Sequence, residues 1–217
     1  MLKGAVFDMD GLMFDTERLV YENWQQMMDS LGYPYDLEFF KLTIGKRKKE
    51  VEQIYLSRFG KDFPYWELAD RCRNIYVARV SREGIPVKKG LYEILSFLKD
   101  KNVKIALATS TSRRTTELNL RSAEVYEYFD ALVCADEVKN GKPHPEVFLT
   151  AAKKLGLPSE ECAAFEDSIN GIKSAFAANM ITVMVPDFLQ PSDEIIPMIN
   201  YLFDDLSQAV EMKEWQQ

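Results

Sequence analysis

The chain has 217 residues, of which 47% are hydrophobic and 12% aromatic, so it can bury a core and is not intrinsically disordered. Its formal net charge of -7 argues against a general nucleic-acid-binding surface, which would need an excess of basic side chains. Its three cysteines lie far apart, and no apolar stretch is long enough for a signal peptide or a membrane span, so we expect a cytoplasmic protein.

The first element in chain order is an apolar run, Gly4–Phe7, which predicts a buried strand. The segment after it is far longer than one crossover helix requires. Its sequence predicts only helices, over residues 16–31, 37–42, 46–59 and 65–82. We therefore expect an all-α cap domain, residues 14–84, inserted into a core domain made of residues 1–13 and 85–217. The insertion follows the carboxyl end of a strand, which is where α/β sheets bind ligands.

Strand and helix patterns alternate after the insertion. The predicted strands are near-continuous apolar runs, as in parallel strands that are covered on both faces, and they span residues 103–108, 131–134, 163–165 and 181–185. The predicted helices span residues 91–101, 115–122, 145–155 and 168–178. The C-terminal segment predicts a short helix, an edge strand near Tyr201–Phe203 and a final helix from Ser207. This alternation predicts an α/β fold with a doubly wound parallel sheet.

Two carboxylates, Asp8 and Asp10, directly follow the first predicted strand and precede Gly11. Each of them makes the other more difficult to ionise. A fold rarely places such a pair at a buried strand end unless a cation or a reaction requires it. Residues two apart in a strand point to the same side, so both carboxylates can reach one ligand.

Three further polar clusters follow later strands. They are Thr109–Ser112, Gly141–Pro145, which contains Lys142, and Glu166–Ser168. Alone, each has an ordinary structural explanation as a turn, a helix N-cap or a solvated loop. Because parallel strands end at one edge of a sheet, we expect all four clusters to form one site, and their joint occurrence favours function.

The four motifs, FDMDGLMFDTE, LATSTSR, NGKPHPEVF and FEDSINGIKSA, resemble those of the haloacid dehalogenase superfamily. The similar branch has a helical cap and contains β-phosphoglucomutase-like enzymes and sugar-phosphate phosphatases. The resemblance covers nearly the whole chain. It implies a Rossmann-like core and an enzyme that acts on a small phosphorylated metabolite, with no nucleic-acid or membrane partner.

The resemblance also implies a role for each matching residue. Asp8 would be the nucleophile that forms an aspartyl-phosphate, and Asp10 the general acid and base. Lys142 would supply the positive charge that screens the phosphoryl oxygens. Mg²⁺, a hard cation, would bind the Asp8 side chain, the Asp10 carbonyl and the Asp167 carboxylate. Glu166 would act on the metal through a water molecule.

Phosphate binding is predicted at the end of the second strand. The resemblance implies that the Thr109 hydroxyl and the Ser110 amide bind the phosphoryl group. A basic run in the cap could be an exposed first helical turn or a contact with substrate. The further candidates for substrate contact are Thr111, Arg113, Lys46, Arg47 and Lys48.

We therefore expect a Mg²⁺-dependent phosphatase that acts on a sugar phosphate through an aspartyl-phosphate, and a monomer, because the cap must open and close. A phosphosugar mutase is the alternative. Mutases of this branch carry a histidine in the first cap helix, where this chain has Val20. A non-enzymatic phosphate-binding protein is more remote, because it predicts the loss of a motif residue and none is lost. Dehalogenation requires no general acid, and Asp10 supplies one.

Overall fold

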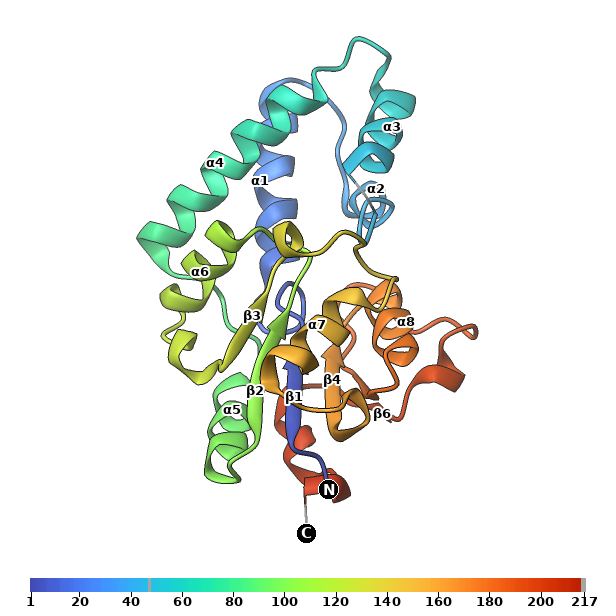
Figure 1. Ribbon diagram of the computed structural model, residues 1–217. Coiled ribbons are helices and arrows are strands. Elements are labelled where there is room, and N and C mark those ends of the chain that lie inside the picture. Colours follow the sequence, from blue (N-terminus) through green and yellow to red (C-terminus); the bar gives the residue numbers. More distant parts are fainter. Residues whose placement is uncertain (47, 216–217) are drawn as a thin grey trace. The chain divides into compact units, whose positions relative to one another are not determined.

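The computed structural model describes residues 1–46 and 48–215 and divides into two compact units (Figure 1). The core unit comprises Met1–Asp15 and Ile85–Gln217, and the helical unit comprises Thr16–Gly84. The first boundary therefore follows Asp15 and not Met13. Phe14 remains with the core because it forms isolated β-bridges with Asp10 and Val87.

The core unit is built on a six-stranded parallel sheet. The strands lie in the order β3-β2-β1-β4-β5-β6, which confirms the predicted doubly wound sheet. Because β1 lies between β2 and β4, residues that follow these three strands become neighbours at one edge. The strands are β1 (Gly4–Phe7), β2 (Lys104–Ala108), β3 (Ala131–Val133), β4 (Cys162–Glu166), β5 (Ile181–Met184) and β6 (Tyr201–Leu202).

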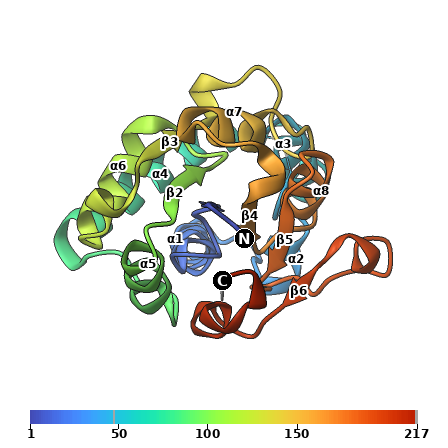
Figure 2. The ribbon, with the colours of Figure 1, turned by 60° about the horizontal axis from the view of Figure 1, so that its bottom comes forward.

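Helices cover both faces of this sheet (Figure 2). On one face, Val6 and Ala164 share a buried cluster with Phe148 of α7 and Ala175 of α8. The small alanines allow the helices to approach the strands closely. On the opposite face, α5 packs with the C-terminal segment. The helices are α5 (Leu91–Asp100), α6 (Arg113–Ser122), α7 (Glu146–Leu155) and α8 (Ile169–Ala177).

The C-terminal segment differs from its prediction. The predicted final helix consists of two 3₁₀ helices, η5 (Leu206–Glu211) and η6 (Lys213–Trp215), and the short helix before β6 is also 3₁₀, η4 (Ile196–Met198). From Leu206 onward, the buried side chains recur every three residues, which matches the 3₁₀ period and not the α-helical one. These buried residues are Leu206, Ala209, Met212 and Trp215.

The helical unit packs around an aromatic cluster. Its helices are α1 (Thr16–Ser30), α2 (Leu37–Lys41), α3 (Lys48–Phe59) and α4 (Tyr65–Glu83), and residues 16–46 and 48–84 contain no strand. Trp24 contacts both Tyr55 and Tyr65, and the hydroxyls of Tyr35 and Tyr55 form a buried 2.8 Å hydrogen bond. Among the described helices of the whole chain, none is long and apolar enough to cross a membrane.

The two connections between the units pair with each other inside the core. The Asp15 amide donates to the Pro86 carbonyl, and the Lys88 amide donates to the Met13 carbonyl, each at 2.9 Å. The chain therefore leaves the core and returns to it through neighbouring, hydrogen-bonded segments.

Candidate active site

The strand ends bring three of the polar clusters together at one edge of the core. Asp8 directly follows β1, and its amide donates to the Phe165 carbonyl of β4 at 2.9 Å. Thr109 directly follows β2, and its amide donates to the Val133 carbonyl of β3 at 3.0 Å. Glu166 is the last residue of β4. All three polar side chains are buried, so the sheet order holds them in a site that excludes most water.

Lys142, from the loop before α7, joins Asp8 to Glu166. Its ammonium lies 2.5 Å from Oδ1 of Asp8 and also donates to Oε1 of Glu166. It lies 5.0 Å from the ring centroid of Phe148, which supports it from α7. Its side chain is only 7% exposed. The sequence pattern allowed a solvated loop lysine, whereas the structure shows a buried cation between two carboxylates.

Backbone and hydroxyl groups fix the other oxygen of Glu166. Its Oε2 accepts hydrogen bonds from the amides of Asp167 and Ser168, at 3.2 and 3.1 Å, and from the Ser168 hydroxyl at 2.9 Å. Ser168 is also the N-cap of α8, because its hydroxyl accepts from the Gly171 amide at 3.0 Å. The Glu166 carboxylate is thus held from both sides, by Lys142 and by the start of α8.

The sequence placed Ser168 in the fourth polar cluster, but we predicted neither its role nor that of Gly171 in holding Glu166. A Cβ atom at position 171 would stand 1.8 Å from Cδ of Glu166, so only glycine leaves space for this carboxylate. A serine at the start of the predicted helix was a readable N-cap signal. That signal does not say which carboxylate the helix would hold.

Asp10 is oriented by the hydroxyls after β2. The Thr111 hydroxyl donates to Oδ2 of Asp10 at 2.7 Å, and the Thr109 hydroxyl lies 3.5 Å from the same oxygen. The Thr111 amide in turn donates to the Thr109 hydroxyl at 3.0 Å. Ser110, between them, is exposed. The predicted phosphate-binding hydroxyls therefore face a carboxylate in this structure.

Asp8, Asp10, Glu166 and Asp167 form an acidic edge of the core sheet. Two pKa values are perturbed there, those of Asp8 and Lys142. Burial raises the pKa of Asp8 from 3.8 to about 8; Lys142 opposes the shift, while Glu166 and Asp10 add to it. Burial alone would lower the pKa of Lys142, but the charges of Asp8 and Glu166 outweigh it and hold that pKa above its ordinary value. Lys142 therefore stays protonated. Its single positive charge does not balance the several carboxylates around it.

The excess of carboxylates fits a divalent cation. Oxygen atoms of Asp8, Glu166 and Asp167 all lie within 4.8 Å of one another, and all three residues are buried. An all-carboxylate set is typical of hard cations such as Mg²⁺. Added positive charge would also favour the ionised form of Asp8, which the bare site disfavours. The donors present therefore suit the metal that the sequence predicts.

A second group of possible ligands, Cys134, Asp136 and Glu137, is less suited to a metal. Glu137 pairs with the side chains of Arg113 and Lys154. Burial raises the pKa of the Cys134 thiol, which keeps it protonated. These contacts give the group a structural explanation, because they join the loop after β3 to α6 and α7.

Arg113, a predicted substrate contact, is bound within the core unit to groups in and after β3. The Arg113 guanidinium donates to the Leu132 carbonyl at 3.1 Å and to Glu137. Lys46 and Lys48 are exposed in the helical unit. Arg47 lies outside the described residues.

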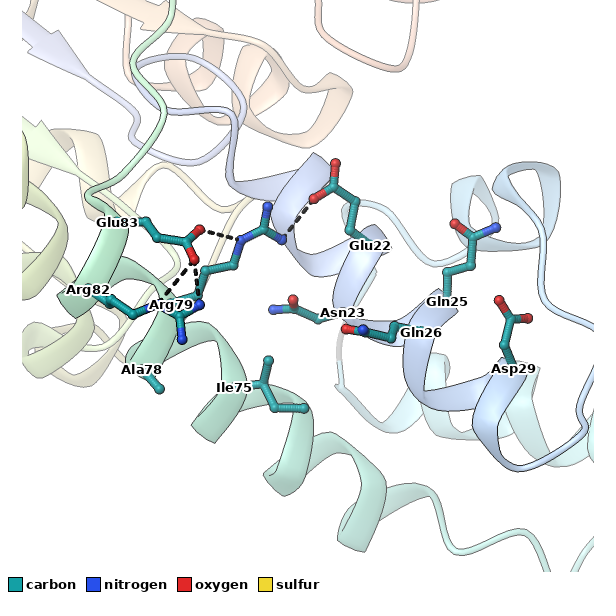
Figure 3. A pocket seen from close by; sticks show the side chains of 10 residues that line it. All are labelled: Glu22, Asn23, Gln25, Gln26, Asp29, Ile75, Ala78, Arg79, Arg82 and Glu83. Atoms are coloured by element: carbon teal, nitrogen blue, oxygen red, sulfur yellow. Dashed lines mark hydrogen bonds and ion pairs between the residues drawn. The ribbon is translucent and has the colours of Figure 1, made fainter.

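The helical unit has a concave feature of its own, a groove between α1 and α4 of about 660 Å³ (Figure 3). Arg79 lines it and pairs with Glu22 at 2.8 Å and with Glu83 at 3.3 Å. Most of the charged side chains that line the groove thus pair with one another. The groove is lined by Glu22, Asn23, Gln25, Gln26, Asp29, Ile75, Ala78, Arg79, Arg82 and Glu83.

Comparisons with known proteins show the family of this chain. A model of the haloacid dehalogenase-like hydrolase family matches residues 5–185. The phosphorylated carbohydrates phosphatase of Thermotoga maritima is 34% identical over 82% of this chain and 82% of its own. Hexitol phosphatase B of Escherichia coli K12 is 32% identical over 84% of this chain and 82% of its own. The crystal structure of a β-phosphoglucomutase from Clostridium difficile has a TM-score of 0.77 and 27% identity, covering 100% of this chain and 96% of that one.

Proposed function

This chain belongs to the haloacid dehalogenase-like hydrolase family and is a phosphoric monoester hydrolase, and from that premise we propose that it is a Mg²⁺-dependent sugar-phosphate phosphatase. The observation that carries the proposal is the buried Lys142 ammonium between Asp8 and Glu166. A single fixed cation beside a strand-end carboxylate suits transfer of a phosphoryl group to that carboxylate.

In the first step, an oxygen of Asp8 attacks phosphorus and the bond from phosphorus to the ester oxygen breaks. Asp10 gives a proton to that leaving oxygen, so the sugar departs as a neutral alcohol. The Thr111 hydroxyl, 2.7 Å from Asp10, holds the Asp10 carboxyl in one orientation. The product on the enzyme is an aspartyl-phosphate at position 8.

In the second step, Asp10, now a carboxylate, removes a proton from water, and the oxygen of that water attacks phosphorus. The bond from phosphorus to Asp8 breaks, which releases inorganic phosphate and restores both carboxyl groups. Lys142 stabilises negative charge on the phosphoryl oxygens in both steps, and Glu166 keeps its ammonium in position.

Mg²⁺ would be held by the carboxylates of Asp8 and Asp167 and by the carbonyl of Asp10. Glu166 would act on the metal through a water molecule. When bound, this cation supplies charge neutralisation between the anionic ester and the carboxylates. The Thr109 hydroxyl and the Ser110 amide would bind the phosphoryl group. Contacts with the rest of the substrate are proposed for Lys46, Arg47, Lys48 and Arg113.

The test measures phosphate release across sugar phosphates, sugar-alcohol phosphates and nucleotides. We expect turnover that EDTA removes and Mg²⁺ restores, and that Asp8→Asn abolishes while the circular dichroism spectrum is unchanged. Asp193→Asn, at an exposed position, is the matched control and should retain activity. Retained turnover in Asp8→Asn, or hydrolysis without metal, would overturn the mechanism.

A phosphosugar mutase is the second candidate, because one similar structure is that of a β-phosphoglucomutase. At the position where mutases of this branch carry a histidine, this chain has Val20, which packs against the aromatic cluster of the helical unit. A valine cannot move a proton. We therefore favour hydrolysis. A mutase would convert a hexose phosphate to its isomer faster than to free phosphate when primed with a hexose bisphosphate, and this assay separates the two candidates.

A further inference from the structure

A fifth carboxylate, Asp187, lies beside Asp167 and Gly11, in the loop after β5. Its Oδ1 accepts a hydrogen bond from the Lys88 ammonium at 2.6 Å. The Asp187 side chain is 12% exposed and that of Lys88 25% exposed. Lys88 belongs to the segment that returns from the helical unit, and its amide is bonded to Met13. One ion pair therefore joins the returning segment to the loop after β5.

The other oxygen of Asp187 has no such partner. Its Oδ2 is buried and forms no hydrogen bond with any described residue. A buried carboxylate oxygen that has lost water without gaining a partner is unfavourable, and proteins usually supply a donor or a cation. An ion pair that only anchored the loop would leave this oxygen unexplained.

The position of Gly11 shows where this oxygen points. A Cβ atom on Gly11 would stand 2.3 Å from Oδ2 of Asp167 and 3.4 Å from Oδ2 of Asp187. Gly11 also has a φ of +83°, which favours glycine. The two carboxylate oxygens thus lie on the same side of Gly11, in space that a larger residue would fill. Like charges so placed repel each other unless positive charge lies near both.

We propose that Asp187 is a positioning residue of the cation site, acting on the bound cation from beyond its direct ligands and held in place by Lys88. This inference rests on the proposed Mg²⁺-dependent function and extends it to a residue outside the four motifs. Lys88 holds one oxygen of Asp187, so the other remains beside the space at Gly11 that Asp167 also borders. Outer carboxylates of this kind typically change metal affinity by 10–100-fold when they are removed.

The test compares Mg²⁺ affinity in the wild type, Asp187→Asn and Asp205→Asn. The last is a matched control, because Asp205 pairs with the neighbouring Lys89 at 2.7 Å and its side chain is 16% exposed. Affinity is read from the rise in unfolding temperature as Mg²⁺ is added to metal-free protein, which requires no substrate. Phosphate release is then measured over the same Mg²⁺ range.

We expect Asp187→Asn to weaken Mg²⁺ binding at least tenfold, with turnover returning as Mg²⁺ is raised, and Asp205→Asn to bind Mg²⁺ like the wild type. Wild-type Mg²⁺ affinity in Asp187→Asn, or equal weakening in both variants, would overturn the inference while leaving the proposed function intact. If the wild type itself neither binds Mg²⁺ nor needs it for turnover, the proposed function fails and the inference fails with it. Should Asp187→Asn not fold, Asp187→Ser, smaller and neutral, is compared in the same way.

Discussion

Gly171 lies against Glu166 so closely that a single added methyl group would overlap the carboxylate. The nearest atoms to a Cβ at position 171 would be Cδ, Oε1 and Oε2 of Glu166, at 1.8–2.0 Å. Glu166 in turn holds Lys142. The position of the site's ammonium therefore depends on a residue that has no side chain.

Gly171→Ala should displace the Glu166 carboxylate and reduce phosphate release about 10–100-fold, because Lys142 loses one of its two charged hydrogen-bond partners. The same substitution at Gly141 is the control, since a Cβ there would meet nothing within 4 Å. Steady-state kinetics and urea unfolding of both variants check the prediction. Equal activity of the two alanine variants would contradict it.

Thr111→Val should act through Asp10. The substitution keeps the shape of the side chain but removes the 2.7 Å hydrogen bond to the carboxylate. A hydrogen bond to a charged group contributes about 1.5–3 kcal/mol, so we expect kcat to fall about 10–100-fold and the pH profile of kcat to shift. A rise in KM with unchanged kcat and pH profile would instead indicate a phosphate-binding role. Thr115→Val, whose hydroxyl lies 3.4 Å from that of Ser112, is the control.

Asp8 should make the metal-free protein less stable as the pH rises. Its pKa is about 8 in the folded protein and ordinarily 3.8, so the folded state holds this proton more tightly. The resulting stabilisation is complete below about pH 4 and is lost as the pH rises toward 8. In EDTA between pH 5 and 8, the wild type should therefore lose stability relative to Asp8→Asn, by at most about 1.4 kcal/mol per pH unit.

Urea unfolding of both proteins at several pH values measures this difference. Saturating Mg²⁺ should reduce it, because a cation favours the charged carboxylate. Parallel stability curves for the wild type and Asp8→Asn in EDTA would show that Asp8 is already ionised in the folded protein.

Tyr55→Phe should destabilise the helical unit, because it leaves the buried Tyr35 hydroxyl without its 2.8 Å partner. We expect a loss of about 1–2 kcal/mol in the free energy of unfolding. The double substitution of Tyr35 and Tyr55 by Phe should cost less than twice as much, since it leaves no unpaired hydroxyl. Tyr33→Phe, in the same cluster, is the control. Additive single effects would contradict the prediction.

Much of the fold could be predicted because the core strands are short apolar runs with polar ends. Ile181–Met184, for example, forms β5 where Ile181–Val185 predicted a strand. The C-terminal segment could not be predicted as readily. Its apolar residues suit an amphipathic helix in general, and only packing against α5 selects the three-residue period of η5.

Some residues of the candidate site could likewise be predicted from the sequence, and others could not. Asp8, Glu166 and Lys142 could be predicted because they follow strand ends or lie in a motif that resembles a known one. The partnership of Lys88 with Asp187 could not, because 99 positions separate the two residues and neither lies in a recognisable pattern. Contacts between distant loops depend on the folded sheet and leave no local trace in the sequence.

The paired connections at Met13–Asp15 and Pro86–Lys88 make the helical unit a replaceable part of the chain. Since its two ends enter and leave between hydrogen-bonded neighbours, any folded segment whose own ends lie close together could occupy that place without altering the sheet. Selection can therefore change what is inserted there while the carboxylates, the lysine and the strands that carry them stay the same. In such a chain, the helical unit and the site on the core unit can evolve separately.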